Sequence, residues 1–389
     1  MSKGIIKRWF GERFEVEKLK KPIEYQLKKP LPKNIGWFHT LGSMSLFLFV
    51  SQVLTGILLL IYYRPTVNEA FESVKYITTT AHMGWLYRQV HAWGANLMII
   101  VVFLHMFRTF VTGSFKKPRE LTWVIGIFLW ILTLIFGFSG YLLPWNQLAY
   151  WATTVGTEIV GAVPVVGEFI RMVLRGGTAV GSETLSRFFV IHVIILPWAI
   201  WFLIVIHLFL VRYQGMATLD RVGNEKKVDE KEGTPFFPHH VLKEGIILFI
   251  LLGVLISLSV LAPVDLGEKA DPLTTPHAVK PEWYFLAAYH VLKYFPKLVG
   301  IFVVGLAPLL MLLWPFFDRS PERHPFKRPI SITFGILVLF SLVYYGMLGH
   351  ISESKMKIFG KTYEFDIFGK PHVVLPSEEK VLEKAVTNK

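Results

Sequence analysis

Four histidines lie inside long uncharged stretches of the sequence, where ionisable side chains are costly and usually functional. His91 and His105 share one stretch and are 14 residues apart, whereas His192 and His207 share another and are 15 residues apart. Four turns of an α-helix take about 14.4 residues, so the two histidines of a stretch share one helix face, about 21–23 Å apart along the axis. Each stretch therefore presents two imidazoles at two depths.

Imidazoles arranged in this way suit haem iron. If the two helices run in the same direction, His91 faces His192 at one depth and His105 faces His207 at the other. No carboxylate or thiolate lies near them, and two opposed imidazoles fill both axial positions of a haem iron. A lone buried histidine more often makes an interhelical hydrogen bond, and zinc requires three or four ligands at each site. The pattern therefore favours two bis-histidine haems.

The uncharged stretches themselves predict helices that cross a membrane. Thirty residues without a charge lie between Lys33 and Arg64, and six further uncharged runs of 19 to 37 residues follow. A helix needs about 20 apolar residues to cross the ~30 Å hydrocarbon core, so we expect an all-α integral membrane protein with seven spans. Only 18% of the 389 residues are charged, which excludes a soluble enzyme and a disordered chain. The chain has no cysteine, which excludes a disulfide scaffold, a thioether-bound haem and an iron–sulfur cluster held by its own thiolates.

The basic residues indicate how the spans are oriented. With the N-terminal side called n and the opposite side p, n-side segments hold 24 Lys and Arg and p-side loops hold 10, the C-terminal tail left aside. The positive-inside rule therefore predicts a multi-pass protein of the cell membrane with its N-terminus in the cytoplasm and its C-terminus on the opposite side. His91 and His192 then form the p-side pair, and His105 and His207 the n-side pair. The net charge of +13 follows from this topology, so no nucleic-acid partner is expected.

The spans are expected in two blocks separated by a charged linker. The first block is a four-helix haem-binding domain, and the second adds three further helices and a long p-side loop. The boundaries are a cytoplasmic N-terminal segment at 1–36, the four-span domain at 37–215, a cytoplasmic linker at 216–240, the three-span domain at 241–350 and a polar tail at 351–389. The N-terminal segment lacks the apolar core of a signal peptide.

Glycines repeat the histidine spacing on two other spans. Gly42 and Gly56 lie 14 residues apart on the first span, and Gly126 and Gly140 lie 14 apart on the third. These spans run opposite to the histidine spans, so Gly42 and Gly126 fall at the depth of the n-side pair and the other two at the depth of the p-side pair. Missing Cβ atoms there would let a porphyrin lie against the backbone, although small residues also serve ordinary helix packing in membranes.

Two arginines flank the histidines of the second span. Arg88 lies three residues before His91, and Arg108 lies three residues after His105, each on the face of its histidine and toward its own membrane surface. Cations at these positions would match haem propionates. Alternatively, the two arginines only extend their charged ends toward water from the end of a span.

Four segments together make a family resemblance specific. They are RQVHAWGAN at 88–96, LHMFR at 104–108, GFSGYLLPWNQ at 137–147 and PEWYFLAAY at 281–289. Across roughly residues 30–350 the chain resembles cytochrome b of the quinol-oxidising cytochrome bc complexes, as a single chain with features of the photosynthetic branch. The resemblance implies a subunit of a proton-translocating quinol–cytochrome c reductase. Its two b-type haems, of lower potential on the p side and higher on the n side, would carry electrons across the membrane in a Q cycle.

The resemblance also implies a quinol-oxidising site on the p side, with PEWY as its signature. A hydroquinone releases two electrons and two protons, so its site needs a proton acceptor in an apolar pocket, and Glu282 meets that demand. Outside the family match, a Glu in a proline-rich loop is as often a solvated or capping carboxylate. The other side chains at matching family positions are Tyr284, Tyr141, Phe138 and Tyr289.

On the n side the resemblance implies a quinone-reducing site. Lys243 and Glu244 resemble the basic–acidic pair that the family has there, and Arg212 stands where mitochondrial-type relatives have a histidine. Thr40 occupies the position of the cysteine that tethers an extra haem in the photosynthetic branch, so no third haem is expected. The eighth span of mitochondrial relatives is not expected either.

The implied partners are a Rieske iron–sulfur protein, a c-type cytochrome, a quinone of the membrane and a second copy of the complex. Two other classes of protein compete with this interpretation. A di-haem membrane anchor of a dehydrogenase would explain the histidines and glycines but would need neither the second block of spans nor PEWY. A transporter would be expected to show interrupted spans with charges near the midplane, and these spans are unbroken and uncharged at their centres.

Overall fold

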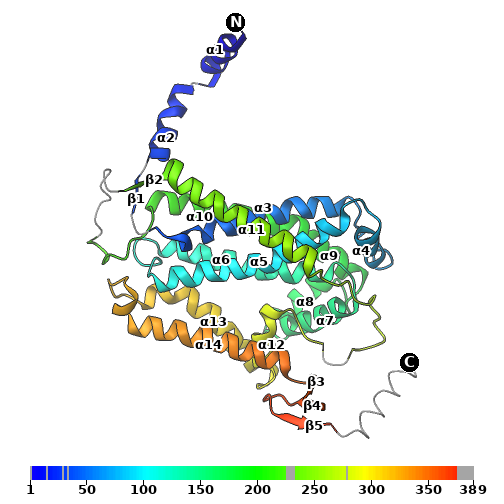
Figure 1. Ribbon diagram of the computed structural model, residues 1–389. Coiled ribbons are helices and arrows are strands. Elements are labelled where there is room, and N and C mark those ends of the chain that lie inside the picture. The colour runs from blue at the N-terminus through cyan, green and yellow to red at the C-terminus, as the bar shows by residue number, and fades with distance from the viewer. Residues whose placement is uncertain are drawn as a thin grey trace.

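The computed structural model describes residues 2–14, 16–28, 30–32, 35–224, 233–276 and 279–374. Among these residues, seven helices are long and apolar enough to cross a membrane, which confirms the predicted all-α fold with seven spans (Figure 1). They are α3 (Leu41–Leu60), α5 (Gly84–Val111), α6 (Glu120–Leu142), the continuous run of α9 (Ser182–Val190), η2 (Ile191–Ile195) and α10 (Leu196–Gln214), then α11 (Val241–Leu261), α13 (Lys297–Phe317) and α14 (Pro329–Ile351).

The first four spans form the central bundle, in which α3 packs along α5 and α6 packs along α10 (Figure 1). The later spans are distributed over two sides of this bundle. On one side α11 packs on α3 and α5, where Leu251 and Leu255 are buried against Leu48. On the other side α13 packs on α6 and α14 on α5, around a cluster centred on Phe110 and Trp123. Both blocks of spans therefore share apolar cores.

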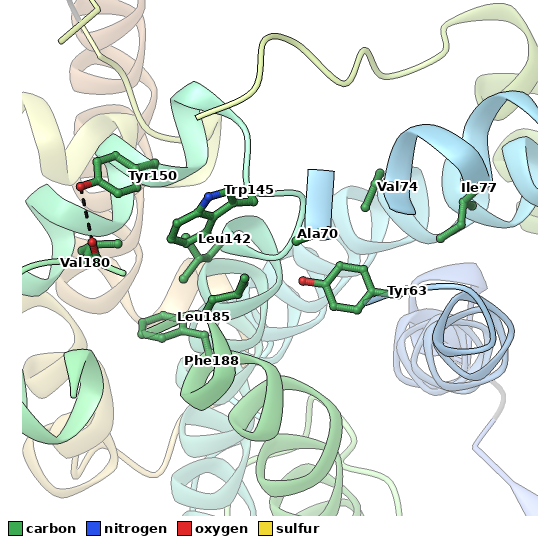
Figure 2. Packing of buried hydrophobic residues seen from close by; sticks show 10 residues of the cluster. All are labelled: Tyr63, Ala70, Val74, Ile77, Leu142, Trp145, Tyr150, Val180, Leu185 and Phe188. Carbon is green, nitrogen blue, oxygen red and sulfur yellow. Dashed lines mark hydrogen bonds between the residues drawn. The ribbon is translucent and has the colours of Figure 1, made fainter. Parts of the chain in front are cut away.

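The p side of the bundle is covered by three short helices: α4 (Ala70–Thr79), α7 (Gln147–Gly161) and α8 (Gly167–Arg175). Figure 2 shows the buried cluster that holds this cover, in which Trp145 and Leu142 lie among side chains from α4, α7 and α9. The Tyr63 hydroxyl donates to the Leu143 carbonyl at 2.8 Å and joins the end of α3 to the end of α6. The Asn146 side chain caps α7 by accepting from the backbone N–H of Ala149 at 2.8 Å.

The PEWY segment lies inside this p-side cover. It forms a short 3₁₀ turn, η4 (Trp283–Phe285), that leads into α12 (Leu286–Leu292). The indole N–H of Trp283 donates to Asn96 Oδ1 on α5 at 2.6 Å. This contact and the packing of α12 against α13 and α14 fix the segment between the two blocks of spans.

On the n side, a buried ionic cluster joins the α5–α6 loop to the α13–α14 loop. Lys116 Nζ donates to one carboxylate oxygen of Asp318 at 2.5 Å, and Arg328 donates to the other at 2.9 Å. Burial alone would raise the pKa of the Asp318 carboxyl, but hydrogen bonds from Lys116 and Ser331 bring it below its ordinary value. The carboxylate is therefore charged and satisfied, which makes the cluster a fixed link between the two blocks.

Several elements differ from the sequence-based expectations. A short turn, η3 (Phe236–His240), precedes α11, and Phe237 within it has a non-helical backbone with a φ of −108° and a ψ of 135°. The N-terminal segment forms α1 (Ser2–Phe14) and α2 (Val16–Lys28), followed by β1 (Pro30–Leu31), which pairs with β2 (Thr234–Pro235) of the linker.

The tail also has more structure than its polarity indicated. It forms a three-stranded antiparallel sheet of β3 (Lys355–Ile358), β4 (Lys361–Phe365) and β5 (Pro371–Val373), next to the p-side end of α14 (Figure 1). Gly360 and Gly369, both with positive φ, make the two turns. Strands this short carry too little alternation to be recognised from the sequence.

Candidate functional site

The p-side histidines face each other across the bundle. His91 lies on α5 and His192 on η2, and their ring centroids are 6.3 Å apart with an interplanar angle of 72°. Two imidazoles on opposite sides of one metal, each with a nitrogen about 2.0–2.1 Å from it, have ring centroids roughly 6 Å apart. The separation therefore matches the space that a single six-coordinate iron requires.

Hydrogen bonds fix the orientation of both p-side imidazoles. His91 Nδ1 lies 2.9 Å from Thr55 Oγ1, and His192 Nδ1 lies 3.1 Å from Ser139 Oγ. Each hydroxyl already donates to a backbone carbonyl of its own helix, so it accepts from the imidazole Nδ1–H. The Nε2 atom of each ring then keeps its lone pair for a ligand, which is the usual arrangement at metal-bound histidines.

The four predicted glycines lie directly against the four histidines. A Cβ atom at Gly42 would lie 3.4 Å from His105 Cε1, and one at Gly126 would lie 3.4 Å from His207 Cε1. At the p-side depth the corresponding separations are 3.4 Å from Gly56 to His91 and 2.5 Å from Gly140 to His192. Each glycine therefore lies next to a histidine at its predicted depth. The sequence had predicted contact with a porphyrin and did not specify which histidine each glycine would face.

A π-helical turn accounts for the unequal histidine spacing. His192 lies in η2 (Ile191–Ile195), where the helix widens from the i→i+4 to the i→i+5 pattern. Such a turn takes up one extra residue, so 15 residues on this span cover the same four turns as 14 residues on α5. The insertion keeps His192 and His207 on the face that looks toward α5.

The two predicted arginines have different surroundings. The guanidinium of Arg88 donates to the carbonyls of Val264 and Asp265, both at 3.0 Å, and so fixes the loop that follows α11. Arg108 lies near the ring of His39 at the n-side end of α5. Within the described ranges, no three His, Cys, Asp or Glu side chains gather into a set that could hold a metal ion.

A cavity of about 470 Å³ lies between α6, α7, the PEWY segment, α12 and α13, and we refer to it as the p-side cavity. Its wall is mainly aliphatic and aromatic, from residues far apart in the chain such as Ile131, Val155 and Pro308. All five side chains predicted for the quinol-oxidising site line it: Phe138, Tyr141, Glu282, Tyr284 and Tyr289.

The p-side cavity has few polar groups, and some of them have raised pKa values. Burial raises the pKa of the Glu282 carboxyl and raises that of the Tyr284 hydroxyl. The Tyr141 hydroxyl is buried and has no hydrogen-bond partner in the part of the chain that the structure describes. Gly137 makes room for Tyr284, because a Cβ there would lie 2.9 Å from the Tyr284 hydroxyl oxygen. A carboxyl with a raised pKa beside a hydroxyl without a partner can receive a polar ligand.

The three n-side candidates lie near one another where α10 ends and α11 begins. The Arg212 guanidinium lies 4.9 Å from the ring centre of Phe236, and Lys243 Nζ donates to the Ile35 carbonyl at 3.3 Å. Glu244 pairs with His240 at 3.2 Å. His240 is buried and was missed from the sequence, although its place one helical turn before Glu244 is a usable signal.

Comparisons with known proteins agree over most of the chain. Residues 26–215 match the family model described as "Cytochrome b/b6/petB", and residues 269–365 match the one described as "Cytochrome b(C-terminal)/b6/petD". The "Cytochrome bc complex cytochrome b subunit" of Chlorobaculum thiosulfatiphilum is 45% identical over 86% of this chain and 78% of that protein. "Cytochrome b6" of Acaryochloris marina is 44% identical over 54% of this chain and 96% of that protein. A solved structure described as "Hyperthermophilic respiratory Complex III" superposes with a TM-score of 0.80 and 33% identity, over 89% of this chain and 92% of the other.

Proposed function

This chain belongs to the cytochrome b family, as the cytochrome b subunit of a bc-type quinol:cytochrome c oxidoreductase, and we propose that its two histidine pairs hold two b-type haems. His91 and His192 would ligate the p-side haem of lower potential. His105 and His207 would ligate the n-side haem of higher potential. When bound, such haems would supply one-electron transfer.

The p-side pair carries the haem proposal. The 6.3 Å between its ring centroids matches one iron between two imidazoles, and the hydroxyls of Thr55 and Ser139 keep the Nε2 lone pairs available. The glycine opposite each ring removes a side chain that would otherwise fill the space beside it. Arg88 near the start of α5 and Arg108 near its end would offer cations to the haem propionates, with the Arg88 guanidinium also donating to the Val264 and Asp265 carbonyls.

Gly56 provides a test of this assignment that does not touch an axial ligand. We expect Gly56→Leu to lower the content of the p-side haem and to leave the n-side haem in place. The four added carbons start 3.4 Å from His91 Cε1, and overpacking of this kind costs about 1–3 kcal/mol. Gly253→Leu on α11 is the matched control, because a Cβ there has no atom within 4 Å. Equal loss of both haems in the Gly56 variant would assign the glycine to general helix packing.

The p-side cavity carries the proposal for quinol oxidation. A quinol bound there would present a hydroxyl to the Glu282 carboxylate, which accepts the proton as electrons leave the ring. The raised pKa of Glu282 brings the group nearer to neutral pH, where a general base is most effective. The aromatic rings of Phe138 and Tyr289 exclude water, and the hydroxyls of Tyr141 and Tyr284 orient the quinol.

The two electrons of each quinol have different destinations in this proposal. One goes to a Rieske iron–sulfur protein and then to a c-type cytochrome, and the other crosses the membrane to reduce quinone on the n side. The chain has no cysteine, so the iron–sulfur acceptor has to be a partner subunit. Arg212, Lys243 and Glu244 would bind and protonate the n-side quinone, with His240 beside Glu244. We also propose that the n side is the cytoplasm and that the complex is a homodimer.

Filling the p-side cavity tests whether quinol binds there. We expect Ala288→Trp to raise the quinol KM about tenfold or more, since the indole takes apolar contact area worth ~25 cal/mol per Å² from the ligand. Leu273→Trp, on an exposed position of the same p-side loop, is the control. Quinol-dependent cytochrome c reduction by the purified complex, with haem content measured alongside, gives the answer. An unchanged KM in an Ala288→Trp variant with both haems would place the quinol elsewhere.

A further inference from the structure

The segment that follows α14 is fastened to the helix that walls the p-side cavity. One face of α12 and its preceding turn lines the cavity through Phe285, Ala288 and Tyr289. The opposite face packs on α14, where Gly349 lets the two backbones approach: a Cβ there would lie 2.7 Å from the Leu286 carbonyl oxygen. The position of α12 therefore depends on contacts made by the end of α14 and the tail.

A chain of charged and aromatic contacts runs from the tail to the cavity wall. Glu353 Oε2 accepts from Lys293 Nζ at 2.6 Å. The same ammonium lies 4.5 Å from the ring centre of Tyr289, a cation–π distance, and Tyr289 lines the cavity. The Lys293 side chain is 18% exposed and the Glu353 side chain is 40% exposed, so the ion pair is partly shielded from water. The Glu353 carboxylate therefore positions the Lys293 ammonium, which in turn contacts the ring of Tyr289.

A second set of hydrogen bonds fixes the same helix. The Tyr294 hydroxyl donates to the Ile367 carbonyl of the tail at 3.1 Å, so it accepts from His290 Nε2–H at 2.7 Å. His290 is fully buried, and its Nδ1 lies 3.4 Å from the hydroxyl of Ser352. The ring of Phe368 stacks on Tyr294 with centroids 5.6 Å apart. The segment after α14 and the β4–β5 turn thus contact the C-terminal end of α12 at two points, and the contact through Lys293 leads to Tyr289.

The backbone at Glu353 is unusual for a residue with a side chain. Its φ of 57° lies in the left-handed region, where a Cβ atom is disfavoured and glycine or asparagine is common. The conformation is held by a hydrogen bond from the Glu353 N–H to the Phe365 carbonyl at 2.7 Å. Strained residues of this kind tend to occur at functional positions. Here the strain accompanies a carboxylate that is directed to Lys293.

We propose that Glu353 is a positioning residue for quinol oxidation, which acts through Lys293 to hold Tyr289 in the wall of the p-side cavity. The inference rests on the proposed function, because it assigns a part in quinol binding to a residue outside the cavity. It also gives the C-terminal sheet a role, since that sheet supplies the backbone contact at Phe365 that fixes Glu353.

Substitutions at Glu353 test this role in the assembled complex. We expect Glu353→Gln to raise the quinol KM about two- to fivefold, as for loss of a partly exposed ion pair, with kcat within about twofold of wild type. The Kd of a hydroxynaphthoquinone that competes with quinol should rise by the same factor. Glu353→Gly should give the same result and cannot fail through backbone strain, because glycine favours a positive φ. Glu353→Asp should recover part of the lost affinity.

The control is Glu364→Gln, which removes a carboxylate of similar exposure from an ion pair with Lys355 in the same sheet. It should behave as wild type. Wild-type KM and Kd in both Glu353→Gln and Glu353→Gly, an equal effect of Glu364→Gln, or a lower kcat with unchanged binding would each overturn the proposal. This test is separate from the test of Glu282 as the proton acceptor, because Glu282→Gln is expected to lower kcat whereas Glu353→Gln is expected to change KM and Kd.

Discussion

Replacing His192 with leucine is expected to leave one haem per chain and to abolish quinol-dependent cytochrome c reduction. Leucine cannot ligate iron, so the proposed p-side haem would keep only His91 as a protein ligand. The n-side pair lies about four helical turns away, so its haem should remain. The polypeptide should stay in the membrane, because an apolar side chain replaces a polar one within a span. Haem content per chain and the reduced-minus-oxidised spectrum measure both outcomes.

The pairing of the histidines can be separated from general damage to the bundle. His91→Leu should remove the same haem as His192→Leu, whereas His207→Leu should remove the other. His350→Leu, at an exposed position on the p-side end of α14, should keep both haems. Two haem equivalents in the His192→Leu variant would contradict the pairing of His91 with His192.

The second large effect is expected at Glu282. Glu282→Gln keeps the shape of the side chain but cannot accept a proton, so quinol oxidation should slow by up to the ~10²–10⁴-fold that general acid–base catalysis contributes. Both haem spectra should be unchanged, because Glu282 lies in a p-side loop and is not a proposed ligand. Steady-state rates at saturating quinol over a range of pH provide the measurement.

The direction of the Glu282 pKa shift predicts how the rate of quinol oxidation depends on pH. Glu282 has to be deprotonated to accept a proton, so the rate should fall as the pH drops through its pKa. Burial raises that pKa, which moves the acidic limb of the profile above the ordinary Glu value of about 4.3. The Glu282→Gln variant should lose this limb, whereas Glu268→Gln, at an exposed position of the same loop, should keep it. A Glu282→Gln enzyme with wild-type rate and profile would reduce Glu282 to a structural residue of the loop, so the proton would pass to water or to another side chain.

The features that periodicity governs could be predicted from the sequence. Seven apolar runs of spanning length predict seven helices, because the bilayer sets the length of each. The helical repeat places His91 and His105 on one face and predicts the depth of Gly42 and the other three glycines. The residues of the p-side cavity were predicted from the family resemblance, not from periodicity, since they come from separate segments of the chain.

Other features depend on contacts that no local pattern encodes. The π-turn at 191–195 was missed because it appears in the sequence only as a histidine spacing of 15 in place of 14. The ion pair of Glu353 with Lys293 joins residues 60 positions apart, and both look like ordinary surface charges when taken alone. The tail sheet was missed because its strands are too short to show a clear alternation of apolar and polar residues.

A redox titration of the purified complex, followed at the absorption bands of the b-type haems, tests the central claim most directly. Two bis-histidine sites at different depths predict two one-electron components of equal amplitude at distinct potentials, of which only the higher remains in His192→Leu. A single component in the wild-type complex, or a titration of His192→Leu that still shows both, would contradict the assignment of two haems to these two histidine pairs.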